Sequence, residues 1–192
     1  MMLNKKLVVG MIATAGFMLS AAASAQVYVG ATVGKAHWND DCKNVVSCST
    51  SSNTYKLLGG YNIDKNFAVE ASYFSLGTIS ATGNVGGTNV SADMKGKGFE
   101  VSGLYKYEFT PELSGFAKLG LASIKAEGSG AVAGVGAYND STTSTQPVFG
   151  FGASYKLTKE LALRGEFETR KIKFSGDKEA VNNISVGLQY SF

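Results

Sequence analysis

From Val27 to the end of the chain, apolar and other side chains alternate with a period of two, and this alternation is the feature that most limits the fold. A period of two places successive side chains on opposite faces of an extended strand, whereas an amphipathic helix needs a period near 3.6 residues. No stretch after residue 26 keeps a helical apolar stripe. We therefore expect an all-β protein.

Eight alternating runs can be read, and the clearest covers residues 99–109, where Phe99 and Val101 share one face and Glu100 and Lys106 the other. The runs cover residues 27–34, 55–63, 67–74, 99–109, 113–121, 149–157, 161–168 and 183–192. Tight turns connect them at 64–66, 110–112 and 158–160. Longer connections rich in Gly, Ser, Thr and Asn lie near 36–53, 77–97, 126–146 and 172–181. This pattern predicts an eight-stranded antiparallel up-and-down barrel with short turns at one end.

Alternation does not say which face points outward, because a soluble eight-stranded barrel turns its apolar residues inward around a ligand. Here the other face mixes Gly, Ser and both signs of charge, which suits a crowded polar interior. Eight strands of about 11 residues, tilted by about 45°, are long enough to cross a bilayer. Aromatic residues also mark the strand ends near the short turns, as in a membrane-interface girdle: Tyr61, Phe67, Tyr107, Phe109, Tyr155, Tyr190 and Phe192. We predict a transmembrane β-barrel, with a soluble barrel or sandwich as the alternative.

The first 25 residues have the three parts of a secretory signal. Lys5 and Lys6 precede an apolar stretch of 13 residues from Leu7 to Leu19, and Ala23-Ser24-Ala25 forms an A-x-A cleavage site. The stretch is short of the about 20 residues that a spanning helix needs. We expect residues 1–25 to be a cleaved signal peptide and residues 26–192 to form the barrel domain.

Export places Cys42 and Cys48 in an oxidising compartment, where such a pair usually forms a disulfide. One His and two Cys cannot complete a three-His or a four-Cys zinc site, so we expect neither a metal nor a cofactor. Without Lys5 and Lys6, the 18 basic residues fall to 16 against 15 acidic ones. No large basic field is therefore available for nucleic acid.

Three stretches resemble the N-terminal transmembrane barrel of the outer membrane protein A family. They run from residues 58–61 through 67–70, from 107–113 through 118–120, and from 147–149 through 163–166. The resemblance covers nearly all of the chain after the leader, and the four long connections diverge. It implies an integral protein of the outer membrane of a Gram-negative bacterium. Full-length members carry a peptidoglycan-binding domain after the barrel, and because the sequence stops at Phe192 we do not expect a cell-wall tether.

The last eight residues are similar to the C-terminal signal read by the outer-membrane barrel assembly machinery. The pattern is polar-x-Gly-x-x-aromatic-x-aromatic, and Gly187, Tyr190 and Phe192 occupy its specified positions. The resemblance implies that this machinery and periplasmic chaperones are partners during biogenesis.

Several charged residues fall on the inward face near the short turns: Glu70, Lys106, Lys118, Arg164 and Glu166. Because burying such charges separately is costly, they should form pairs. We expect Glu70 to pair with Arg164, and Glu166 to pair with either Lys106 or Lys118.

The resembled family has an interior ion-pair gate, and Glu70 and Arg164 match its acid and its base. The family's second gate acid falls on Ser154 and its lysine on Leu104, so the match is incomplete. The charges either fill and stiffen a narrow interior or form a working gate.

These features favour a monomeric outer-membrane barrel with a structural and surface-interaction role, such as envelope integrity, adhesion or recognition through the long connections. The alternative is a narrow ion or small-solute pore gated by the interior ion pairs. We do not expect an enzyme, because His37 has only Asp40 and Asp41 nearby and no nucleophile motif accompanies them. The expected partners are outer-membrane lipid and lipopolysaccharide. The basic fourth connection either touches lipopolysaccharide or is simply solvated.

Overall fold

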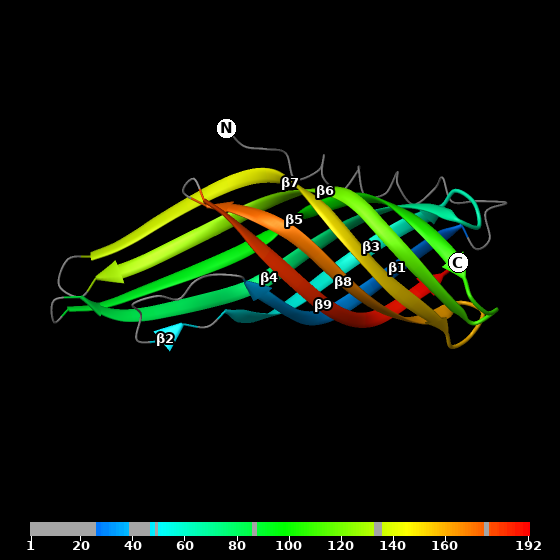
Figure 1. Cartoon of the computed structure of the whole chain (residues 1–192), viewed down its shortest axis with the longest axis horizontal. Helices are drawn as coiled ribbons and strands as arrows, with labels where there is room; N and C mark the ends of the chain where they lie inside the picture. The colour runs from blue at the N-terminus through cyan, green and yellow to red at the C-terminus, as the bar shows by residue number, and fades with distance from the viewer. Residues whose placement is uncertain (1–25, 39–46, 49, 86–87, 133–135, 175–176) are drawn as a thin grey trace, which may run out of the picture.

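The computed structural model describes residues 26–38, 47–48, 50–85, 88–132, 136–174 and 177–192. All regular structure in these residues is β-strand, and the strands enclose the elongated barrel in Figure 1. The strands are β1 (Val27–Trp38), β2 (Ser47–Cys48), β3 (Ser51–Asn62), β4 (Phe67–Val85), β5 (Thr88–Glu108), β6 (Leu113–Val132), β7 (Gly136–Lys156), β8 (Leu161–Phe174) and β9 (Asp177–Ser191). Across the same residues, no helix is long and apolar enough to cross a membrane.

Eight long antiparallel strands close on themselves, as the alternation predicts. Each pairs with its neighbours along the chain, and β1 pairs with both β3 and β9. The two-residue strand β2 is an addition that the sequence did not predict, and it lies against β4 with Ser47 opposite Thr82. Closure gives the backbone donors and acceptors of every long strand a partner on both sides in the barrel wall, which a lipid environment requires.

The structure corrects the expectation of long loops in three of the four connections. Strand pairing continues to Val85 opposite Thr88, to Val132 opposite Gly136 and to Phe174 opposite Asp177. These stretches lack apolar alternation because neither of their faces meets lipid, yet backbone pairing needs no apolar side chain. The pattern therefore marked the membrane-spanning part of each strand rather than its full length.

Part of the first connection and all of the leader lie outside the described residues. Cys42 is among them, so the disulfide with Cys48 stays a prediction. The signal peptide of residues 1–25 also lies outside the described part of the chain and stays a prediction.

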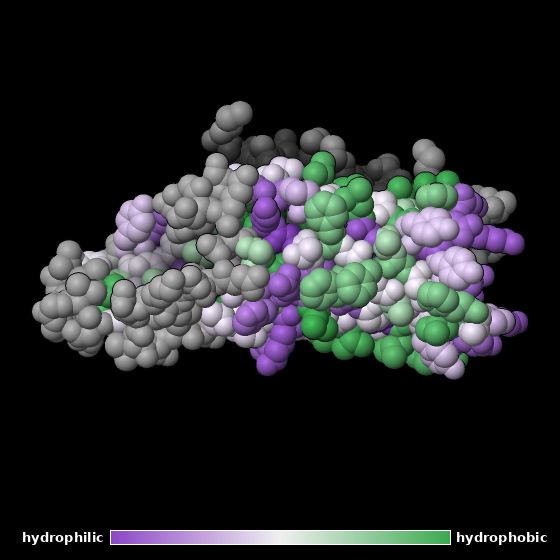
Figure 2. Space-filling view, in the orientation of Figure 1, coloured by the Kyte–Doolittle hydropathy of each residue, from purple (hydrophilic) through white to green (hydrophobic). Residues whose placement is uncertain are grey.

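The apolar face of the alternation points outward and forms a continuous band. Figure 2 shows this band towards the short-turn end, bordered on both sides by hydrophilic residues. On β5 it runs from Phe99 through Val101, which is 65% exposed, to Phe109 just past the strand. Ten residues at about 3.3 Å each, tilted by about 45°, span about 23 Å along the membrane normal, close to the apolar height of outer-membrane barrels.

The interior contains two apolar clusters, so the expectation of a polar interior holds only for its middle. The short-turn cluster consists of Tyr28, Leu58, Ala68, Leu104 and Phe116. The hairpin-side cluster consists of Ala36, Trp38, Phe74, Leu76, Ile79, Ala122, Ile124, Ala126, Val148, Ile172 and Val181. An eight-stranded barrel leaves room only for side chains, and close packing admits apolar ones wherever no charge needs a partner.

The close approach of β9 to β1 explains why residue 187 is a glycine, and it gives a test of the β1–β9 register. A Cβ atom on Gly187 of β9 would overlap the carbonyl oxygen of Ala31 on β1, whereas a Cβ on Gly103 would meet nothing within 4 Å. We expect Gly187→Ala to lower the free energy of unfolding by about 1–3 kcal/mol, because the two strands must separate. Gly103→Ala is the matched control and should unfold like the wild type.

Urea unfolding in lipid vesicles measures both variants. The chain's single tryptophan, Trp38, is a suitable probe because it is 1% exposed inside the hairpin-side cluster. Equal stability of Gly187→Ala and Gly103→Ala would contradict the β1–β9 register.

Candidate functional site

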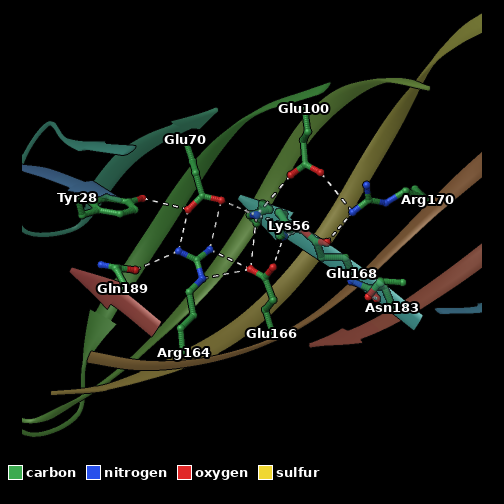
Figure 3. Close-up of polar contacts among 12 residues, drawn as sticks. Tyr28, Lys56, Glu70, Glu100, Arg164, Glu166, Glu168, Arg170, Asn183 and Gln189 are labelled. Carbon is green, nitrogen blue, oxygen red and sulfur yellow. Dashed lines mark hydrogen bonds and ion pairs between the residues drawn. The ribbon is translucent and has the colours of Figure 1, made fainter. Parts of the chain in front are cut away.

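Eight charged side chains are buried in the middle of the barrel, and each is at most 4% exposed. We call them the ionic cluster. Four are acids and four are bases: Lys56, Glu70, Glu100, Lys118, Arg164, Glu166, Glu168 and Arg170. They come from β3, β4, β5, β6 and β8, and most of them appear in Figure 3.

Strand β8 supplies half of the ionic cluster because its charges fall at every second residue. Arg164, Glu166, Glu168 and Arg170 therefore all point inward. Within the strand, Arg164 Nη2 lies 2.9 Å from Glu166 Oε2, and Arg170 Nη2 lies 2.5 Å from Glu168 Oε2. Each arginine thus pairs with the neighbouring glutamate of its own strand. The remaining oxygens of Glu166 and Glu168 contact cations from other strands.

Lysines from two other strands supply those cations. Lys118 Nζ on β6 lies 3.0 Å from Glu168 Oε1 and 3.6 Å from Glu166 Oε2. The same ammonium lies 2.7 Å from Glu70 Oε1 and 3.4 Å from Glu100 Oε1. Lys56 of β3 lies 2.6 Å from Glu168 and also contacts Glu166. One buried ammonium, that of Lys118, thus faces all four carboxylates.

Glu70 is held from three directions, as Figure 3 shows for its contacts with Tyr28 and Arg164. Arg164 Nη1 donates to Glu70 Oε2 at 2.7 Å, Lys118 donates to Oε1 at 2.7 Å, and the Tyr28 hydroxyl donates at 3.2 Å. Arg164 Nη1 also donates to the Gln189 side chain at 3.1 Å. Glu70 and Arg164 are therefore fixed by several partners rather than by one pair.

The two arginines connect the ionic cluster to the apolar clusters at its ends. The Arg164 guanidinium lies 4.5 Å from the ring centre of Phe116 in the short-turn cluster. The Arg170 guanidinium lies 4.2 Å from the ring centre of Phe74 in the hairpin-side cluster. Cation–π contacts of this kind let each guanidinium face carboxylates with its edge and an aromatic ring with its plane. The charges are thus covered by apolar side chains on both sides.

Strand β7 contributes space instead of charge. A Cβ atom on Gly150 would lie 3.1 Å from Glu168 Cγ, and one on Gly152 would overlap the ring of Phe116. The two glycines face the lumen, so the long side chains of β6 and β8 occupy the volume beside them. Glycine at these two positions therefore leaves room for the β8 backbone, for Glu168 of the ionic cluster and for Phe116.

Of the five charged residues singled out from the sequence, the structure brings four together: Glu70, Lys118, Arg164 and Glu166. Lys106 lies apart from them, and its Nζ donates to Asn62 Oδ1 at 2.5 Å. In the strand register Lys106 is opposite Phe116, whereas Lys118 is opposite Leu104. Lys106 is therefore one inward position closer to the short turns than Lys118, at the level of Phe116, and Lys118 is the lysine that meets Glu166.

The sequence reading passed over four members of the ionic cluster: Lys56, Glu100, Glu168 and Arg170. All four lie at inward positions, but the sequence prediction considered only charged residues that lie four to six residues from a short turn. Glu100 lies ten residues before Thr110, and Arg170 lies ten residues after Glu160. At about 3.3 Å per residue and a tilt of about 45°, the ionic cluster extends about 14 Å along the barrel axis. Counting charged inward positions along the whole of each run would have found Lys56, Glu100 and Glu168, whereas Arg170 lies two residues beyond the run of 161–168.

A cavity of about 510 Å³ opens at the short-turn end of the barrel. Lys106 and Lys156 line it, and it reaches Arg164 between Tyr28 and Phe116. Beyond it, the short-turn cluster and the ionic cluster occupy the next levels of the lumen. In the described part of the chain, no group of three or more His, Cys, Asp or Glu side chains is arranged to hold a metal.

The remaining predicted positions lie on the strands as follows. Gly187 is opposite Thr32 on one side and Arg164 on the other. Tyr190 and Phe192 point outward at the short-turn end, with ring centres 5.2 Å apart. Of the two positions where the family's second gate pair falls, Ser154 is opposite Arg164 and Leu104 belongs to the short-turn cluster.

The family model described as the OmpA-like transmembrane domain matches residues 22–192. The chain belongs to the OmpA-like transmembrane domain family. It is therefore an outer-membrane β-barrel of a Gram-negative bacterium, and the apolar band in Figure 2 is its lipid-facing surface.

Two curated relatives differ in their length. Outer membrane protein A of Shigella flexneri is 27% identical over 193 residues, which cover 94% of this chain and 53% of that protein. The chain thus spans about half the length of that relative. An uncharacterised protein of Haemophilus influenzae is 28% identical over 188 residues, which cover 95% of this chain and 98% of that protein.

Two solved structures share the fold of this OmpA-like barrel at low sequence identity. Neisserial surface protein A matches with a TM-score of 0.62 at 17% identity, over 89% of this chain and all of that one. Ail, the attachment invasion locus protein of Yersinia pestis, matches with a TM-score of 0.59 at 12% identity, over 88% of this chain and all of that one.

The central position of Lys118 leads to a stability prediction. We expect Lys118→Gln to lower the free energy of unfolding by about 3–5 kcal/mol, because it leaves four buried carboxylates with too little positive charge. The exposed pair of Lys156 and Glu108, 3.5 Å apart, offers a control. Lys156→Gln should cost less than about 1 kcal/mol, since an exposed ion pair contributes little.

A double variant separates lost charge from lost packing. Both carboxylate oxygens of Glu100 are buried and accept no hydrogen bond from the described residues, so Glu100 is the weakest-held acid of the ionic cluster. Adding Glu100→Gln to Lys118→Gln should therefore restore part of the lost stability in urea unfolding. A double variant less stable than Lys118→Gln alone would contradict a charge-balance role.

Proposed function

We propose that the protein is a closed, non-catalytic structural barrel of the outer membrane that carries paired strands beyond the membrane for contact with the cell's surroundings. The observation that supports closure best is the balanced ionic cluster between two apolar clusters. Its charges are paired with one another, and only Arg164 lines the cavity at the short-turn end.

A gated pore is the second candidate, and the contact between Glu70 and Arg164 favours it. A working gate would exchange partners around Arg164, and Glu166 at 2.9 Å offers such an exchange. An ion would still have to pass the hairpin-side cluster, in which Trp38, Leu76 and Ile124 are each at most 1% exposed. We therefore place the closed state first and treat conduction as the outcome to be tested.

The part of the barrel beyond the apolar band supports a role in surface contact. Strands β4, β5, β6 and β7 stay paired there, with Val90 opposite Val132 between β5 and β6. The β7–β8 pairing begins only at Val148 opposite Arg170. The four longer strands thus form a sheet on one side of the barrel, in the position from which outer-membrane barrels contact the exterior. The name of the similarly folded Ail protein refers to attachment.

The proposal extends to biogenesis and to assembly state. We infer that the C-terminal segment with Gly187, Tyr190 and Phe192 is read by the barrel assembly machinery, helped by periplasmic chaperones. The exposed outward rings of Tyr190 and Phe192 are accessible for such recognition. We further infer a monomer, since closure leaves the spanning strands without a free edge. The non-catalytic assignment is supported by His37, which lies exposed at the end of β1.

Planar-bilayer conductance tests closure against the gate. We expect the wild type, Glu70→Ala and Arg164→Ala to give no steady conductance, because the hairpin-side cluster still blocks the lumen. Glu108→Gln, an exposed change at the short-turn end, controls for protein incorporation. Steady channels in the wild type, altered by Glu70→Ala but not by Glu108→Gln, would instead establish the gated pore.

Shortened strands test the surface role. Removing residues 79–94 deletes the outer parts of β4 and β5, which are paired from Ile79 opposite Met94 outward. We expect a Gram-negative host that displays this variant to keep its resistance to detergent but to lose attachment to surfaces. Heat-dependent electrophoretic mobility checks that the shortened barrel is folded. Unchanged attachment by a folded variant would remove the surface-contact role.

A further inference from the structure

A cluster of charges lies on the outer surface just beyond the apolar band, towards the long hairpins. Lys95 and Lys97 of β5 and Lys125 of β6 point outward around a single acid, Glu127 of β6. We call these four residues the rim cluster. On β5 it begins one outward-facing position beyond Phe99, which is 67% exposed and ends the apolar band on that strand.

The register concentrates positive charge in the rim cluster. Lys97 lies directly opposite Lys125 across the β5–β6 pair, and Lys95 lies opposite Glu127. Like charges directly opposite each other destabilise a strand pair. Glu127 relieves this repulsion, since its Oε1 lies 2.9 Å from Lys125 Nζ and 3.1 Å from Lys97 Nζ. One carboxylate paired with two lysines, with Lys95 opposite it in register, leaves an excess of positive charge.

Lys97, Lys125 and Glu127 are accessible to solvent. The side chains of Lys97 and Lys125 are each 47% exposed, and that of Glu127 is 32% exposed. Hydrogen bonds from Lys125 and Lys97 hold the pKa of the Glu127 carboxyl below its usual range. Glu127 is therefore ionised at neutral pH, and the excess charge persists there.

The two rims of the apolar band differ in charge. Exposed or half-buried charges that the structure describes just beyond the band on the hairpin side are Lys35, Lys95, Lys97, Lys125, Lys171, Asp93, Glu127 and Asp140. Those at the short-turn rim are Lys65, Lys106, Lys156, Lys159, Asp64, Glu108, Glu112 and Glu160. Lysines outnumber acids five to three at the first rim, and the two are equal, four to four, at the second. A negatively charged partner is thus favoured at the hairpin side alone.

We propose that the rim cluster binds the phosphate groups of a phosphorylated glycolipid of the outer leaflet, of the lipid A type. A phosphate can accept hydrogen bonds from Lys97 and Lys125 together and offset their mutual repulsion. The acyl chains of such a lipid would lie against the neighbouring outward surface of Phe99 and Val101, which are 67% and 65% exposed. A soluble anion would use only the charges, whereas a lipid also uses this apolar surface.

This inference deepens the proposed function by naming a lipid partner of the barrel, and it rests on the membrane position of the apolar band. It does not depend on whether the barrel conducts, because the rim cluster lies on the outer surface and the ionic cluster inside. Conductance results can therefore overturn the closed state without affecting lipid binding.

Native mass spectrometry of the folded full chain in detergent, titrated with diphosphoryl lipid A, tests the site. We expect Lys97→Gln with Lys125→Gln to weaken binding roughly tenfold, since two charge-assisted hydrogen bonds to phosphate are lost. Glu127→Gln should strengthen binding, because it removes the competing carboxylate. Lys65→Gln with Lys159→Gln, a matched double change at the short-turn rim, should bind like the wild type. Heat-dependent mobility confirms folding of each variant.

Three other probes identify the source of the phosphate. Lipid A without phosphates and phosphatidylglycerol should each bind more weakly than diphosphoryl lipid A, and inorganic phosphate should not displace it. Equal binding of diphosphoryl lipid A by the wild type and the Lys97/Lys125 double variant would overturn the proposal. So would phosphatidylglycerol binding as tightly as lipid A, which would indicate a general anionic surface, or displacement by inorganic phosphate, which would indicate a phosphate site.

Discussion

The need to satisfy every backbone N–H and C=O group inside a lipid layer governs this structure. An all-strand chain meets that need only by closing, and here β1 closes the barrel by pairing with β9. Closing with eight long strands leaves an interior that side chains must fill. The packing of the lumen, the close approach at Gly187 and the inward glycines of β7 all follow from that narrow closure.

A lumen of this width accepts charge only where charge is balanced. Four acids and four bases meet in the ionic cluster, and Lys118 faces all four carboxylates. Arg164 and Arg170 then join these charges to aromatic rings in the two apolar clusters. The same features that let a membrane protein bury eight charges are the ones that support the proposed closed state.

The outer surface of the barrel differs in charge between the two rims of the apolar band. At the short-turn end the charges are mixed, whereas lysines predominate beyond the apolar band on the hairpin side. Beyond this rim, β4 to β7 continue as a paired sheet. The barrel thus presents a lipid-facing band, a basic rim and an exposed sheet in that order. This order suits a protein whose contacts lie at and above the outer leaflet.

The sequence by itself determined the strand class and the eight-stranded architecture, because a period of two and the short turns depend only on neighbouring residues. The outward face was predicted from the charges on the other face and the aromatic residues at the strand ends, not from the alternation. The sequence also placed Glu70, Lys118, Arg164 and Glu166 on the inward face. Tertiary structure decided which of them meet, because the stagger between strands sets their relative depth. That stagger excluded Lys106 and brought Glu100 and Arg170 into the ionic cluster. It also turned the expected loops into paired strands, since backbone hydrogen bonds leave no trace in hydrophobic alternation.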